Sequence, residues 1–78
     1  MQQSKQVLEW QAEALQRGRA EGKVEAVLRL LQRRTGKVVP PSLAATIRRT
    51  TDLATLYQWV DTAADATSLK EFRRQANL

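Results

Sequence analysis

The sequence of 78 residues contains no cysteine and no histidine. Without cysteine, no disulfide can stabilise so small a chain, and such chains often gain stability by forming oligomers. Without histidine, neither the usual zinc ligand sets nor a histidine-based acid–base mechanism is available. We therefore expect a protein that is not an enzyme and that binds no metal and no cofactor.

Long apolar runs are also absent. The longest uninterrupted runs have three residues, as in Ala26-Val27-Leu28, whereas a membrane-spanning helix needs about 20. No segment has the pattern of a signal peptide, so the default expectation is a cytoplasmic protein with no membrane partner.

Positive charge is in excess: 13 Lys and Arg stand against 8 Asp and Glu, a net charge of +5. Residues 1–35 carry +3 and residues 36–78 carry +2, so the excess is spread along the chain. Three arginine pairs stand out: Arg33-Arg34, Arg48-Arg49 and Arg73-Arg74. A basic surface attracts nucleic acid or an acidic partner. Solvated faces of amphipathic helices explain the same pattern, and we favour that explanation.

Residues Ser4 to Arg34 contain no proline and many good helix formers, which predicts one long helix with Ser4 as N-cap. The pairs Glu13–Arg17 and Glu25–Arg29, each four residues apart, favour it further. Its apolar residues form an early group, Val7, Leu8, Trp10 and Leu15, and a late group, Val24, Val27, Leu28 and Leu31.

Small residues recur at every fourth position of this helix and so share one face: Ala14, Gly18, Gly22 and Ala26. Each interior glycine costs about 1 kcal/mol relative to alanine. Either the helix breaks near Gly18–Gly22, or another backbone packs closely on the small residues. We favour packing, and predict an oligomer interface formed by Val7, Leu8, Trp10, Ala14, Leu15, Gly18, Gly22 and Ala26.

The second half predicts three short helices. Gly36 is placed for a left-handed C-cap, and Val38 to Pro41 for an extended segment. A helix at about 42–50 turns Leu43 and Ile47 inward. Asp52 caps a helix at 53–64, whose apolar stripe is predicted to be Leu53, Leu56, Tyr57, Val60 and Ala64.

Ser68 and Glu71 form a capping box for a fourth helix, with Leu69, Phe72 and Ala76 inward. The predicted fold is therefore all-α, a long N-terminal helix followed by three short ones. Residues 1–26 form an oligomerisation helix or connector, and residues 24–78 a small helical domain that shares the long helix. We expect Trp59 to pack in the core or at its edge.

Several motifs suggest a family: the segment Leu28 to Gly36, Val39-Pro-Pro41, Ile47, the segment Leu56 to Asp61, and the segment Thr67 to Phe72. They resemble a C-terminal domain of unknown function found in bacterial recombination-promoting nucleases and putative transposases. That domain typically follows a PD-(D/E)XK nuclease-like domain, through a connector that the segment Arg17 to Lys23 resembles. The resemblance implies a helical domain that lacks the catalytic part.

Glu21-Gly22-Lys23 matches half of the nuclease motif, but that chemistry needs a strand and an upstream acidic metal ligand. No aspartate precedes Asp52, and the segment is predicted to be helical. We therefore expect no catalytic role for Glu21 or Lys23.

Two functions remain. The first is an interaction module that forms homo-oligomers through residues 7–26; as a short form, it would pair with a longer nuclease-like relative and regulate it. The second is an accessory nucleic-acid-binding domain in which Arg33, Arg34, Arg48 and Arg49 contact phosphates weakly. The helix that would enter the groove is 53–64, whose polar side carries Asp61 and Asp65 but no basic residue. We therefore favour the interaction module.

Overall fold

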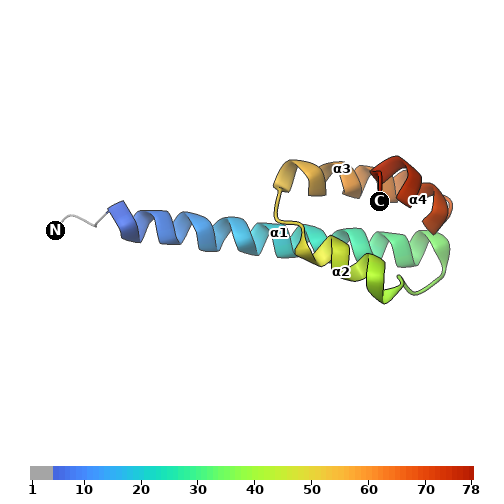
Figure 1. The fold of residues 1–78 in the computed structure, drawn as a ribbon, viewed down its shortest axis with the longest axis horizontal. Coiled ribbons are helices and arrows are strands. Elements are labelled where there is room, and N and C mark those ends of the chain that lie inside the picture. The colour runs from blue at the N-terminus through green and yellow to red at the C-terminus, as the bar shows by residue number, and fades with distance from the viewer. Residues whose placement is uncertain (1–4) are drawn as a thin grey trace.

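Four helices and no strand make up residues 5–78 in the computed structural model, which describes the backbone of those residues and the side chains of residues 11–78. The helices are α1 (Lys5–Thr35), α2 (Pro41–Arg49), α3 (Leu53–Asp65) and α4 (Leu69–Ala76). Figure 1 shows α2, α3 and α4 against the second half of α1, while its first half projects. The predicted all-α fold, one long helix and three short ones, is confirmed. Within residues 5–78, no helix combines the length and the apolar character needed to cross a bilayer.

Helix α1 runs without a break through Gly18 and Gly22, so the alternative of a break at the glycines is wrong. It ends where predicted: Gly36 has a φ of +70°, and its N–H donates to the carbonyl oxygen of Gln32 at 2.9 Å. This left-handed cap satisfies one of the carbonyls that a helix end leaves without a partner. The predicted N-cap, Ser4, lies outside the described residues.

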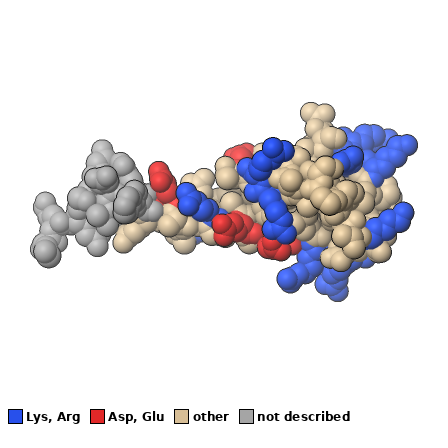
Figure 2. All heavy atoms as spheres, turned by 60° about the horizontal axis from the view of Figure 1, so that its bottom comes forward, with Lys and Arg blue, Asp and Glu red and all other residues tan. Residues whose placement is uncertain are grey.

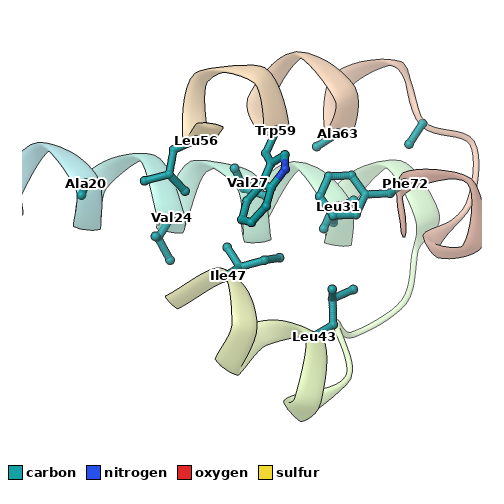
Figure 3. Close-up of a cluster of buried hydrophobic side chains, with 11 residues drawn as sticks. Ala20, Val24, Val27, Leu31, Leu43, Ile47, Leu56, Trp59, Ala63 and Phe72 are labelled. Atoms are coloured by element: carbon teal, nitrogen blue, oxygen red, sulfur yellow. The ribbon is translucent and has the colours of Figure 1, made fainter. Parts of the chain in front are cut away.

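The core is one cluster of eleven buried apolar side chains drawn from all four helices (Figure 3). Helix α1 contributes Ala20, Val24, Val27 and Leu31 from one face. Three of these were predicted; Ala20 was not, and Leu28 is only partly buried. The remaining members are Leu43, Ile47, Leu56, Trp59, Ala63, Ala66 and Phe72. Leu43, Ile47 and Phe72 are buried as predicted.

Helix α3 begins after Asp52 as predicted, but its buried face differs from the predicted stripe. The buried residues are Leu56, Trp59 and Ala63, whereas Tyr57 is 52 % exposed and Ala64 is also exposed. Leu53 and Val60 of the predicted stripe are partly buried against the core, and Trp59 is buried as predicted. The helix is therefore rotated about its axis, away from Tyr57 and towards Trp59. Burying the larger indole removes more apolar area from water, and the Tyr57 side chain remains half exposed.

Two N-caps fix the starts of α3 and α4. The Asp52 carboxylate accepts from the N–H of Thr55 at 3.2 Å, and the Ser68 hydroxyl oxygen accepts from the N–H of Glu71 at 3.1 Å. The predicted capping box is therefore correct for Ser68. The Glu71 carboxylate, however, accepts from the N–H of Thr67 at 3.3 Å instead of the N–H of Ser68. It reaches one residue further back than the usual pattern.

The orientation of α3 can be tested with two aromatic truncations. Trp59→Ala should lower the free energy of unfolding by about 3–5 kcal/mol, because it opens a cavity in the core. Tyr57→Ala should lower it by about 1 kcal/mol or less, since it removes mainly a cation–π contact at the surface. Urea denaturation followed by circular dichroism measures both. Equal losses would contradict the observed orientation and favour the stripe predicted from the sequence.

Candidate functional site

The projecting part of α1 is the most exposed element of the chain. Residues 11–19 are all exposed, and Leu15 is 58 % exposed. Burial begins at Ala20, one turn before Val24. Of the predicted oligomer interface, Val7, Leu8 and Trp10 lie outside the residues whose side chains are described.

The small residues of α1 face away from the core. An added Cβ at Gly18 or Gly22 would find no atom within 4 Å in either case. At about 100° of rotation per residue, Ala14, Gly18 and Gly22 lie on the side of the helix roughly opposite the buried face. Ala14 is exposed and Ala26 is half-buried. We call the face defined by Ala14, Gly18, Gly22 and Ala26 the small-residue face. The unbroken helix α1 places these four residues on one face. No other element of the described chain covers Gly18 or Gly22.

A groove lies where α1 leaves the core, between α1 and the turn that joins α2 to α3. Its lining residues are Arg17, Ala20, Glu21, Val24, Glu25, Arg48, Thr50 and Thr51. One ion pair crosses it: Nη1 of Arg48 donates to the Glu25 carboxylate at 2.7 Å. The predicted Glu25–Arg29 pair is thus replaced by a contact between two helices. Both side chains are more than half exposed, so the pair contributes about 0–1 kcal/mol.

Glu21 and Lys23, which match half of a nuclease motif in the sequence, both lie within α1. The Lys23 ammonium sits 4.7 Å from the centre of the Tyr57 ring, a cation–π contact between α1 and α3. Glu21 is exposed beside the groove. Among the described residues, no three acidic side chains come close enough together to hold a metal ion.

Each of the three arginine pairs lies in the last turn of its helix. Arg33 and Arg34 lie in the last turn of α1, and the other pairs in the last turns of the helices that carry them, Arg48-Arg49 in α2 and Arg73-Arg74 in α4. A cation there is favourable, because the helix dipole places partial negative charge at the C-terminal end. Each pair therefore has a structural reason that involves no partner.

The four arginines predicted to contact nucleic acid do not form one surface. Arg48 of α2 lies beside Glu25 of α1. Glu25 is nine residues before Arg34, so the two positions are separated by about 14 Å along the axis of α1. Nε of Arg34 donates to the carbonyl oxygen of Ala66 at 3.3 Å, in the turn between α3 and α4. Nη2 of Arg49 lies 3.5 Å from the Thr46 hydroxyl of its own helix. The fold thus separates Arg33 and Arg34 from Arg48 and Arg49.

The fold also concentrates the positive charge that the sequence spreads. We call residues 33–40 and 65–78 the basic end of the molecule. It carries six basic residues, Arg33, Arg34, Lys37, Lys70, Arg73 and Arg74, against the two acidic residues Asp65 and Glu71. In Figure 2 the blue Lys and Arg spheres dominate this end, and the red Asp and Glu spheres lie towards the projecting helix. The chain folds back on itself, and this return brings α4 beside the last turn of α1.

Lys37, Lys70, Arg73 and Arg74 were not among the predicted site residues. The Arg73-Arg74 pair was a signal in the sequence, but its proximity to Arg33 and Arg34 depends on how α4 docks. Helix α3, in contrast, has no basic residue and exposes Gln58, Asp61 and Asp65. It is a poor duplex-reading helix in this fold.

Two carboxylates have pKa values below their ordinary ones. The hydroxyl and the N–H of Thr55 donate to Asp52 and hold its pKa below 3.8. At Glu71, hydrogen bonds from the hydroxyl and the N–H of Thr67 hold the pKa below 4.5. Both groups therefore act as caps in their ionised form.

No family model, no curated protein and no solved structure matches the chain.

The lowered pKa values predict the direction of an acid effect on stability. A carboxylate whose pKa is lower in the folded state stabilises the fold above its unfolded pKa. That contribution is lost as pH falls below 4.5 for Glu71 and 3.8 for Asp52, and through their lower folded values.

The double variant Asp52→Asn/Glu71→Gln, which keeps hydrogen-bonding side chains, should therefore lose less stability than the wild type between neutral and acidic pH. Urea midpoints at pH values on both sides of this range measure the difference. Asp61→Asn is the control, because Asp61 caps no helix, and it should keep the wild-type response. An unchanged response of the double variant would contradict the prediction.

Proposed function

We propose that this chain is a non-catalytic interaction module that self-associates through residues 7–26 of α1. The observation that carries the proposal is the exposed front of this helix, residues 11–19, which continues beyond the core. The chain extends 54 Å along its longest axis but only 19 and 17 Å along the others.

Helix energetics support self-association. A helix of about 12–15 residues is only marginally stable in water without tertiary packing, and residues 5–19 are such a helix. Gly18 and Gly22 each cost about 1 kcal/mol relative to alanine. A second helix packed on the small-residue face would offset these costs, because the absence of side chains at Gly18 and Gly22 allows two backbones to approach closely.

The surroundings of the small-residue face are suited to such packing. Leu15 is 58 % exposed, and the sequence places Val7, Leu8 and Trp10 further along the same projecting segment. A tryptophan in an exposed segment favours an interface, since this residue is enriched among those that dominate binding energy. A chain of this size without a disulfide also gains stability by association.

The resemblance to the C-terminal domain of recombination-promoting nucleases and putative transposases suggests the wider context. In that context the module would bring nuclease-like subunits together. A short chain with the same surface would pair with a longer relative and regulate its assembly. We assign no catalytic residue, and Glu21 and Lys23 serve as surface residues of α1 in this proposal.

Gly18→Leu tests the proposed interface, because its two effects have opposite signs. Leucine raises intrinsic helix stability by up to about 1 kcal/mol relative to glycine, and the single chain has room for it, with nothing within 4 Å. It should nevertheless dissociate the oligomer by blocking close approach of a second backbone. Light scattering over a concentration series, with circular dichroism for helicity, measures both effects.

Gln16→Leu is the matched control. Gln16 is also exposed on α1, but two residues, or about 200°, separate it from Gly18. The control should keep the wild-type mass. A wild-type chain that remains monomeric at high micromolar concentration would overturn the proposal, and so would an oligomer that Gly18→Leu leaves intact.

A further inference from the structure

We propose that the basic end binds the phosphate backbone of double-stranded nucleic acid without sequence preference. The surface comprises Arg33, Arg34, Lys37, Lys70, Arg73 and Arg74. It differs from the four arginines that the sequence suggested, and it lies at the opposite end of α1 from the proposed self-association surface.

One hydrogen bond and burial in a common core hold the two parts of this surface together. Nε of Arg34 donates to the carbonyl oxygen of Ala66, 3.3 Å away, which ties the last turn of α1 to the segment before α4. Phe72 of α4 and Leu31 of α1 are both fully buried in the same core cluster (Figure 3). Ala66, between α3 and α4, is also fully buried there. The basic residues of α1 and α4 are therefore held on a rigid support.

The charge of this surface is largely uncompensated within the chain. All six basic side chains are exposed. Two acidic residues lie nearby, Asp65 and Glu71, and the charge of Arg74 acts on the Glu71 carboxylate; six basic residues against these two leave an excess of positive charge. The basic end thus carries most of the net charge of +5, and clustered like charges repel one another unless an anion lies against them.

Helix dipoles explain only part of the cluster. They favour Arg33, Arg34, Arg73 and Arg74, which lie in the last turns of α1 and α4. Lys70 lies in the first turn of α4, where the dipole disfavours a cation. The helix dipole therefore does not explain the position of Lys70, whereas an anionic partner would interact favourably with all six residues.

The chemistry of the surface favours a duplex over other polyanions. Four of the six residues are arginines, whose planar guanidinium groups match phosphate oxygens in bidentate fashion. Single-strand binding relies on exposed aromatic side chains for base stacking. The single aromatic residue of the basic end, Phe72, is fully buried. Lys70, Arg73 and Arg74 share one face of α4, which is only eight residues long. We expect these side chains to contact phosphates, which positions the protein without specifying sequence.

The test measures binding of a fluorescein-labelled duplex DNA of two helical turns to the full chain by fluorescence anisotropy, over a range of salt concentrations. Arg33→Gln/Arg74→Gln removes one charge from each helix of the basic end. We expect this variant to bind at least about tenfold more weakly at low salt. Its slope of log affinity against log salt should be shallower by about 1.8, since each lost phosphate contact contributes about 0.9.

Arg19→Gln/Arg49→Gln is the matched control, because it removes the same charge from exposed positions away from the basic end. It should change the affinity less than about threefold. Arg33→Lys/Arg74→Lys, which keeps the charge, should retain most of the binding and separates loss of charge from loss of fold.

Three outcomes would overturn the proposal. One is a wild-type chain that does not bind the duplex at low salt. Another is equal weakening by the basic-end variant and the control, which would mean that only net charge matters. The third is polyglutamate binding as tightly as the duplex at the same salt, which would indicate an acidic protein partner. The proposal does not depend on self-association, because Gly18 and the basic end occupy separate parts of α1.

Discussion

The packing of one face of α1 against α3 and α2 is the interaction on which the whole structure depends, and α4 packs in turn on α3. Ala20, Val24, Val27 and Leu31 supply that face, and Ile47, Trp59 and Phe72 are the largest side chains that the short helices place in the same core. Helices of 8 to 13 residues are marginal in water by themselves. Each of them is therefore stabilised by tertiary contact, α2 and α3 on α1 and α4 on α3, around one common core.

Because the core uses one side of α1, the opposite side and the projecting front remain free for other contacts. Val24 and Val27 lie on the buried face of α1, whereas Gly18 and Gly22 lie on roughly the opposite face. The helices that cover Val24 and Val27 therefore do not block a second chain from packing on Gly18 and Gly22. The same helix also ends in Arg33 and Arg34, at the basic end. Self-association and anion binding, as proposed, would therefore occupy different regions of one rigid element, and could occur at the same time.

Local features made much of the fold predictable. The end of α1 at Gly36 and the starts of α3 and α4 at Asp52 and Ser68 depend on cap residues that act within one turn. The orientation of α3 was not predictable in this way, because Leu56 fits both possible stripes. The choice between Tyr57 and Trp59 depends on the surface that α1 presents. For a similar reason Glu25 pairs with Arg48 of another helix instead of with its neighbour Arg29.

By itself, the sequence determined that the chain is helical, where α1 ends, where α3 and α4 begin, and that small residues occupy one face of the longest helix. These properties follow from propensity, periodicity and capping, all of which act over a few residues. The tertiary structure alone decided where the charge lies. In sequence the excess is divided between the two halves, but burial of Phe72 and Ala66 in the core docks α4 beside the end of α1. Positive charges that are more than 30 residues apart along the chain are thereby brought to one end of the molecule.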